Sequence, residues 1–255
     1  MSSPRRRRRR QILAAVALTL AVAALYLCGY ESPYRGALVI FHDLSVDRLT
    51  SGTGRVRDKT LKEMLALDLG PKYDPAIRGA YVRTFEDFVR AVKGRGILMV
   101  ELKVPGLAPS GIEQRAVKII QRYDAHQDVV LSSFNPLVLY RVKRLDPRVR
   151  TALIFMDTNW NPELVAEIKP GDLVNLPWPL RQEFIRRALR KIVRPDLLSI
   201  NHEVDEAVID RLIAKGWPVF IWTVDTKEEV RLALSKRPYG VISNEPIRAR
   251  QLRGE

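Results

Sequence analysis

Ala37-Leu38-Val39-Ile40-Phe41-His42-Asp43 is the stretch on which the fold and the active site of this chain are predicted. Five consecutive apolar residues end in an imidazole beside a carboxylate, and a polar loop with two glycines, residues 47–54, follows. A short apolar run bounded by turn signals predicts a buried strand. In α/β proteins, titratable residues at the end of such a strand commonly belong to an active site.

Predicted strands and helices alternate along the rest of the chain. The strands expected next are residues 97–103, 129–131, 151–155, 173–175, 197–200, 219–222 and 240–242, and the helices are 60–67, 84–92, 112–123, 139–145, 204–215 and 227–235. This spacing predicts a parallel sheet with helical crossovers. Because no glycine-rich phosphate loop opens the first crossover, an α/β fold of the TIM-like (β/α) barrel type is favoured over an open sheet.

Length and charge limit the possible functions. The 255 residues, 46% of them hydrophobic, suffice for one α/β barrel domain. The net charge is +14, and it is still +8 without the six arginines Arg5–Arg10, which indicates an anionic partner such as a phosphate-bearing substrate or an acidic membrane surface. No nucleic-acid partner is expected, because no recognition motif accompanies the charge. The single cysteine, Cys28, excludes an internal disulfide and a thiolate metal cluster.

The N-terminal residues predict a single-pass membrane anchor. Residues 1–11 form a basic tail, and residues 12–30 contain no charged side chain, which at about 1.5 Å per residue is just long enough to cross a bilayer. The arginines place the tail in the cytoplasm and the barrel domain, residues 31–255, outside it. The alternative is a signal peptide cleaved after Ala21-Val22-Ala23, which predicts a secreted protein. Apolar residues continue past that site and favour the anchor.

A charged pair stands at the end of the strand 97–103. Glu101 and Lys103 are two residues apart, so their side chains extend from the same face of an extended chain. If that face lines a barrel, two opposite charges are buried together, which is unfavourable unless they bind a ligand. The sequence is equally compatible with a metal-binding carboxylate beside a phosphate-neutralising lysine and with a structural ion pair.

Other polar residues receive different predictions. Ser132-Ser133, Asn201-His202 and the segment 222–225 also end predicted strands. His126 lies in a polar loop between a helix and a strand and is expected to be exposed and inert, and His202 is expected in a solvated loop. The segment 184–194 predicts a helix with apolar pairs opposite a basic face; a barrel helix is favoured over a helix lying on anionic lipid.

Residues 37–246 resemble the glycerophosphodiester phosphodiesterase family, which has an α/β barrel fold. The matching segments are, in order, 39–43, 47–48 with 50–54, 60–61, 67–70, 100–103, 132–134 and 222–225. The resemblance implies that His42 is one of two acid/base histidines and that Glu101 is one of several carboxylates that bind Mg²⁺ or Ca²⁺. It also implies that Lys103 contacts the substrate phosphate and that Trp222 and Asp43 belong to the pocket.

The chain departs from the family pattern at its N-terminal side. No His-Arg-Gly occurs in the sequence, and the expected Glu-x-Asp positions fall at Leu27 and Gly29, within the apolar segment. The first two barrel strands are therefore expected to be missing, which leaves the barrel, the acid/base pair and the metal ligand set incomplete. Loss of one acid/base group typically lowers a rate about 10²- to 10⁴-fold.

Three functions from different classes follow. The first is a membrane-anchored phosphodiesterase that hydrolyses glycerophosphodiesters or lysophospholipid-like phosphodiesters to glycerol phosphate and an alcohol. The second is an inactive family member that binds phosphodiesters or lipid headgroups. The third is a protein that interacts with the membrane surface. The resemblance favours the first, with reduced activity.

Overall fold

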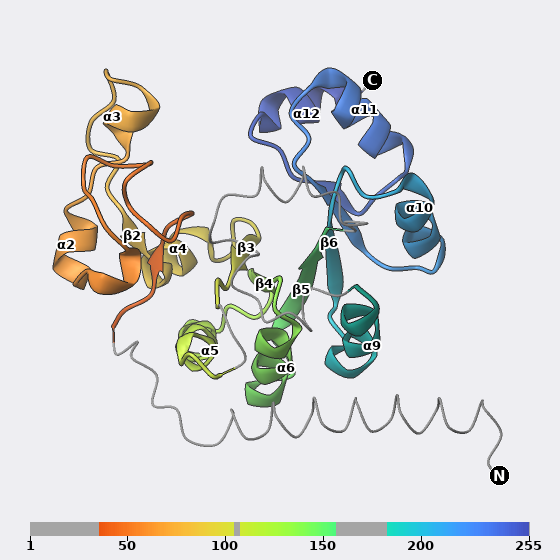
Figure 1. Cartoon of the computed structure of the whole chain (residues 1–255), viewed down its shortest axis with the longest axis horizontal. Helices are drawn as coiled ribbons and strands as arrows, with labels where there is room; N and C mark the ends of the chain where they lie inside the picture. Colours follow the sequence, from red (N-terminus) through yellow and green to blue (C-terminus); the bar gives the residue numbers. More distant parts are fainter. Residues whose placement is uncertain (1–35, 105–107, 157–182, 255) are drawn as a thin grey trace, which may run out of the picture.

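Six parallel strands, hydrogen-bonded in chain order, form the main sheet of the part of the chain that the structure describes. The computed structural model describes residues 36–104, 108–156 and 183–254 (Figure 1). The strands are β3 (Leu98–Glu101), β4 (Val129–Ser133), β5 (Arg150–Phe155), β6 (Leu197–Asn201), β7 (Val219–Trp222) and β8 (Gly240–Val241). Within these residues β3 and β8 are the two edges of the sheet. The predicted parallel α/β architecture is confirmed, as an open six-stranded part of a barrel.

Helices follow the strands and lie around the outside of the sheet (Figure 1). They are α4 (Phe85–Val92), α5 (Ile112–Arg122), α6 (Pro136–Leu145), α9 (Glu183–Val193), α10 (Glu206–Ala214), α11 (Lys227–Ser235) and α12 (Pro246–Arg253). Capping side chains define several of the helix starts: Thr84 and Thr226 form capping boxes, and Asn135 accepts from the Leu137 N–H. With Asn135 as cap and Pro136 in the first turn, α6 begins three residues before its predicted start.

The two faces of the sheet have different roles. On the outer face, strand residues such as Leu131, Leu153 and Ile221 pack with helix residues into two buried apolar clusters. Side chains alternate along a strand, so the residues between them point to the inner face. Glu101 pairs in register with Ser132, and Asn201 with Trp222. The carboxyl ends of the parallel strands therefore place polar side chains on the inner face.

The apolar stretch Leu38–Phe41 does not belong to the parallel sheet, and its prediction as a barrel strand is wrong. It contains the two-residue strand β1 (Val39–Ile40), which pairs antiparallel with β2 (Arg83–Thr84). Leu38 and Ile40 pack against the cluster that contains α4 and α5, whereas Val39 and Phe41 pack against a second, smaller cluster around Met64. The run is continuously apolar because both of its faces contact a core.

A small layer of loops and short helices connects β1 to β2. It contains η1 (Val56–Asp58), α2 (Leu61–Leu65) and α3 (Gly70–Tyr73), and α3 projects from the body of the molecule (Figure 1). The carboxylate of Asp68 accepts hydrogen bonds from the backbone N–H groups of Gly70, Gly79 and Ala80 at 2.8 to 3.0 Å. These bonds close the base of the projecting loop.

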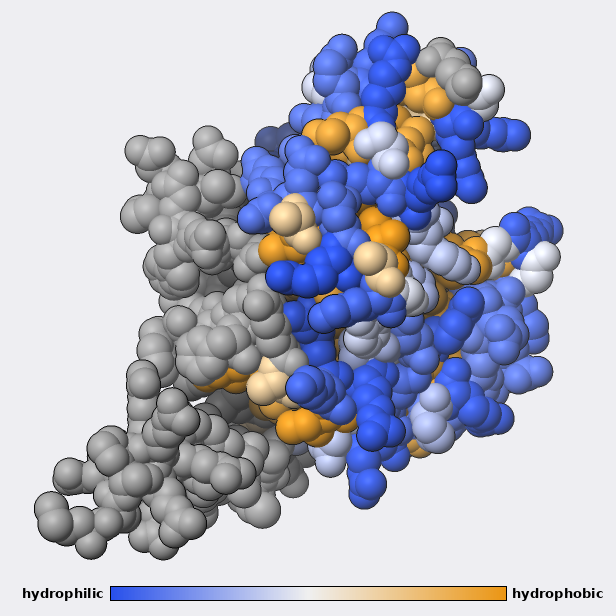
Figure 2. Space-filling view, turned by 90° about the vertical axis from the view of Figure 1, so that its right-hand side faces the viewer, coloured by the Kyte–Doolittle hydropathy of each residue, from blue (hydrophilic) through white to orange (hydrophobic). Residues whose placement is uncertain are grey.

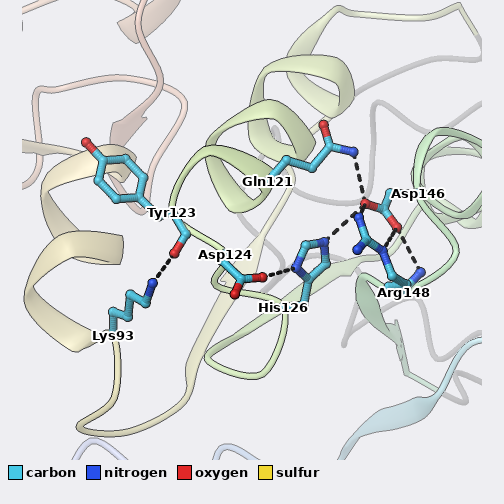
Figure 3. Close-up of polar contacts among 7 residues, drawn as sticks. All are labelled: Lys93, Gln121, Tyr123, Asp124, His126, Asp146 and Arg148. Atoms are coloured by element: carbon cyan, nitrogen blue, oxygen red, sulfur yellow. Dashed lines mark hydrogen bonds and ion pairs between the residues drawn. The ribbon is translucent and has the colours of Figure 1, made fainter.

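His126 is buried, and its predicted exposure is wrong. Its side chain lies between two carboxylates: Nε2 is 3.1 Å from Oδ2 of Asp146 and Nδ1 is 3.4 Å from Oδ1 of Asp124 (Figure 3). Asp146, 3% exposed, also accepts from Gln121 and Arg148. The network joins the end of α5 to the loop between α6 and β5, at the end of the sheet opposite to Glu101. This position indicates a structural role.

We predict that Asp146→Asn destabilises the protein by about 2 kcal/mol at neutral pH, because charge-assisted hydrogen bonds at a buried carboxylate are lost. Hydrogen bonds, first those from Arg148, hold the pKa of Asp146 well below its usual value of 3.8. The contribution is therefore complete above about pH 4 and is lost as the pH falls further. The free energy of unfolding of the full chain in mild detergent is measured for variant and wild type at about pH 7 and at about pH 2.5, which lie above and below the onset of this loss. The difference in unfolding free energy between variant and wild type should be smaller at the lower pH.

The control for this prediction is Asp124→Asn. Asp124 is 91% exposed, so its substitution should change stability by less than about 0.5 kcal/mol. Equal losses for the two variants would contradict a structural role of the buried carboxylate.

Three predicted segments lie outside the described residues: the basic tail 1–11, the anchor 12–30 and the strand 173–175. Among the residues that are described, no helix combines the length and the apolar character needed to cross a bilayer. On the face shown in Figure 2, hydrophilic residues predominate and apolar residues form small separate patches.

Candidate active site

Glu101 and Lys103 form an ion pair at the carboxyl end of β3. Nζ of Lys103 donates to Oε2 of Glu101 at 2.9 Å, and the two side chains are 19% and 28% exposed, respectively. The prediction that both extend from the same face is confirmed. The pair is partly open to solvent.

The backbone that bears Lys103 is held by the neighbouring strand. The N–H of Leu102 donates to the carbonyl of Ser132 at 2.7 Å, and Oγ of Ser133 donates to the carbonyl of Leu102 at 2.9 Å. Nδ2 of Asn135 donates to the carbonyl of Val104 at 3.3 Å. Ser133 and Asn135 thus extend the pairing beyond the end of β3. Residue types alone did not indicate this positioning role.

Trp222 lies on the inner face at the end of β7. Its ring meets that of Phe134 edge-to-face, with 6.0 Å between the centroids. Its Nε1 is buried and has no hydrogen-bond partner among the described residues. The backbone N–H of His202 donates to the Trp222 carbonyl at 2.6 Å. The His202 side chain is half-buried, so its predicted place in a solvated loop is only partly right.

His42 belongs to a second polar group, which follows β1. Its Nδ1 is 2.7 Å from Oδ1 of Asp43, and its side chain is 67% exposed. Arg48 donates to both carboxylate oxygens of Asp43 at 2.7 Å and, as the main cause, lowers the pKa of that carboxyl to about 2. Asp43 is therefore ionised at neutral pH. An ionised carboxylate at Nδ1 favours the imidazole tautomer with its proton on that nitrogen, which leaves Nε2 to exchange protons.

The two groups are adjacent in the fold but are not in contact. Leu38 and Ile40, before His42, pack in the same apolar cluster as Leu102 and Val104, which flank Lys103. Among the described residues, no hydrogen bond or ion pair joins His42 to Glu101. The role of Arg48 as the partner of Asp43 was not predicted from the sequence, although Arg48 stands in the polar loop that follows Asp43.

A divalent cation does not fit the described residues by themselves. Ca²⁺ takes six to eight oxygen ligands and Mg²⁺ about six. Within residues 36–104, 108–156 and 183–254, no group of three His, Cys, Asp or Glu side chains could hold an ion. Glu101 supplies one carboxylate, which is already neutralised by Lys103.

Comparison with known proteins identifies the family of this chain. Residues 36–248 match the model of the glycerophosphoryl diester phosphodiesterase family. The chain belongs to this family. Its members are phosphoric diester hydrolases that act on glycerophosphodiesters, and the earlier resemblance is confirmed over most of the chain. The predicted roles of His42, Glu101, Lys103, Trp222 and Asp43 stay predictions.

Relatives and solved structures agree with this membership. A glycerophosphodiester phosphodiesterase of Caldanaerobacter subterraneus is 28% identical over 83% of this chain and 78% of its own length. A phosphodiesterase of Oleispira antarctica, solved with the product sn-glycerol-3-phosphate, superposes with a TM-score of 0.64 at 18% identity, over 85% of this chain and 79% of that one. The enzyme of Agrobacterium tumefaciens gives 0.61 at 16% identity, over 86% and 83%. The two structures support the fold of this family member.

Proposed function

We propose that this family member is a membrane-anchored phosphodiesterase that hydrolyses glycerophosphodiesters, or lysophospholipid-like phosphodiesters, to glycerol phosphate and an alcohol. The anchor is the apolar segment 12–30, with the domain outside the cytoplasm. The observation that carries the proposal is the Glu101–Lys103 pair on the inner face at the end of β3. Parallel α/β barrels place their reacting groups at this end of the strands.

The residues divide the chemistry between them. The Lys103 ammonium neutralises a non-bridging phosphate oxygen, which favours the charge that develops there as water attacks phosphorus. His42 moves a proton: it donates to the alcohol oxygen as the P–O bond breaks, or accepts from the attacking water. Asp43, held by Arg48, positions the imidazole. Trp222 and Phe134 form an apolar wall for the alcohol portion of the substrate.

A second candidate, binding without turnover, is favoured by one observation. Glu101 is paired with Lys103, and the described residues hold no group of three possible metal ligands. A phosphodiester can still bind Lys103 electrostatically if the chemistry is lost.

One experiment separates the candidates. The purified full chain in mild detergent is incubated with glycerophosphocholine in Mg²⁺, in Ca²⁺ and in excess chelator. Release of glycerol 3-phosphate that is lost in His42→Ala supports the enzyme, and dependence of that release on Mg²⁺ or Ca²⁺ and on Glu101 would add a cation at that carboxylate. No release, together with a thermal shift on addition of glycerophosphocholine that is lost in Lys103→Gln, supports binding without turnover. Neither turnover nor a shift would reject both.

We predict that Asp43→Asn lowers kcat by up to about a hundredfold and leaves KM nearly unchanged, because His42 is misplaced while the phosphate site is intact. Steady-state kinetics on glycerophosphocholine measures the two parameters. Asp58, 66% exposed in the same layer, provides the control Asp58→Asn, with wild-type kinetics expected. A rise in KM alone would assign Asp43 to substrate binding instead of positioning.

A further inference from the structure

Three neighbouring helices hold the excess positive charge of the folded part. The helix α6 packs between α5 and α9 on the outside of the sheet (Figure 1). These helices contain ten Lys and Arg residues and two Glu residues, an excess of eight. Residues 36–255 as a whole have 36 basic and 28 acidic residues, the same excess. The rest of the domain is therefore balanced in charge.

The outward stripes of these helices present cations that have no ion-pair partner among the described residues. Lys118 on α5, Arg144 on α6, Lys191 on α9 and Arg194 just after α9 are exposed and form no ion pair with any described residue. Other cations of the three helices are neutralised, for example Arg122 by Glu86 and Lys143 by Asp196. Asp124, which follows α5, and Asp196, which follows α9 and pairs with Lys143, are exposed acidic side chains at the edge of this face.

Large apolar side chains are exposed between these cations. Tyr140 on α6 is 41% exposed and lies one helical turn before Arg144. Leu145, which ends α6, is 43% exposed, and Ile192, next to Lys191, is 59% exposed. Cations interspersed with a tyrosine and aliphatic side chains match a bilayer interface, where rings and aliphatic groups enter the headgroup region and cations contact phosphates. We call the outward stripes of α5, α6 and α9 the basic face.

The chain also enters the domain close to this face. Eight residues lead from Tyr30, the end of the apolar segment, to Leu38, a distance of at most about 29 Å when fully extended. Leu38 and Ile40 pack in the cluster that contains Val117 of α5 and Val138 of α6. If residues 12–30 span a membrane, the bilayer surface lies within reach of α5 and α6.

We propose that the basic face binds an anionic lipid bilayer and so orients the domain on the membrane. The orientation rests on the proposed anchor, whereas the affinity for anionic lipid rests on the face itself. Each Lys or Arg close to such a surface strengthens binding severalfold. Reversal of three charges should therefore weaken binding to anionic vesicles by about a hundredfold or more.

Site-specific fluorescence tests the contact in the full chain. Cys28→Ser removes the native cysteine, and an environment-sensitive dye is attached at Ile192→Cys on the basic face or at Leu232→Cys on α11, where the residue is 49% exposed. In vesicles of phosphatidylglycerol and phosphatidylcholine, the dye at position 192 should be shielded from a water-soluble quencher and quenched by a headgroup quencher. The dye at 232 should show neither effect, and phosphatidylcholine alone should abolish the difference.

Two triple charge-reversal variants distinguish an effect of the basic face from an effect of the net charge of the protein. Lys118→Glu, Arg144→Glu and Lys191→Glu together should abolish the protection at position 192. The control combines Lys215→Glu just after α10, Lys227→Glu on α11 and Arg250→Glu on α12. It changes the net charge equally and should leave the protection unchanged. Both variants should retain the thermal stability of the wild type, because all six side chains are at the surface.

The outcomes distinguish this inference from the proposed anchor. Resistance to alkaline carbonate extraction with equal dye signals at positions 192 and 232 keeps the anchor and overturns the inference. If carbonate extracts the chain, the proposed anchor is wrong, and binding of each variant to phosphatidylglycerol vesicles is measured directly. Loss of vesicle binding in the basic-face variant alone supports the inference. Equal binding of the basic-face variant and the control variant overturns it. Binding to duplex DNA without vesicle binding also overturns it.

Discussion

His42→Ala is expected to lower kcat for glycerophosphocholine by about 10²- to 10⁴-fold, with little change in KM, because proton transfer to the leaving alcohol loses its acid. The geometry supports this role: Asp43 holds Nδ1 at 2.7 Å, and the imidazole is 67% exposed. Initial rates for wild type and variant, measured over a range of substrate concentrations, provide both parameters. Free imidazole in the buffer should restore part of the rate.

The fold should survive this substitution. An exposed side chain contributes little to stability, so the unfolding midpoint of His42→Ala should match that of the wild type. Arg57→Ala, at a residue whose side chain is 55% exposed in the same layer, is the control and should keep full activity. Activity of His42→Ala close to that of the wild type would exclude His42 as the acid.

Lys103→Gln is expected to lower kcat/KM about 10²- to 10³-fold. Removal of one group that stabilises a developing oxyanion has this magnitude in other enzymes. The loss should be larger here because of Glu101, which lies 2.9 Å from the Lys103 ammonium in the wild type. Without that ammonium, the carboxylate of Glu101 repels the substrate phosphate. Steady-state kinetics should show a raised KM together with a lowered kcat.

Two further variants make this prediction specific. Lys103→Arg keeps the charge and should recover part of the activity, whereas Lys215→Gln, an exposed lysine after α10, should have no effect. A kcat/KM of Lys103→Gln equal to that of the wild type would argue that Lys103 does not face the phosphate.

The parallel architecture could be predicted from the sequence because its signals are local. Strands such as residues 219–222 are short apolar runs bounded by turns, and capping threonines such as Thr84 and Thr226 mark helix starts. The pair Glu101 and Lys103 was found for the same reason: a spacing of two in a strand determines a shared face.

The predictions that failed depended on contacts between distant segments. The run Leu38–Phe41 has the apolar pattern of a buried parallel strand. It is apolar because two clusters enclose it, and its strand β1 pairs antiparallel with β2 outside the main sheet. His126 stands in a polar loop, yet Asp146, twenty residues later, folds back and buries it. Local pattern does not reveal such partners. Likewise, the pairing of Arg48 with Asp43 depends on the path of a loop.

The central claim is that the incomplete set His42, Glu101 and Lys103 suffices for hydrolysis. The most direct test follows glycerophosphocholine by phosphorus NMR during incubation with the full chain in mild detergent, beside His42→Ala. We predict that the diester signal of the wild-type sample is replaced by that of glycerol 3-phosphate, at a rate well above that of the variant. Identical slow conversion in both samples, or no conversion by the wild type, would contradict the claim.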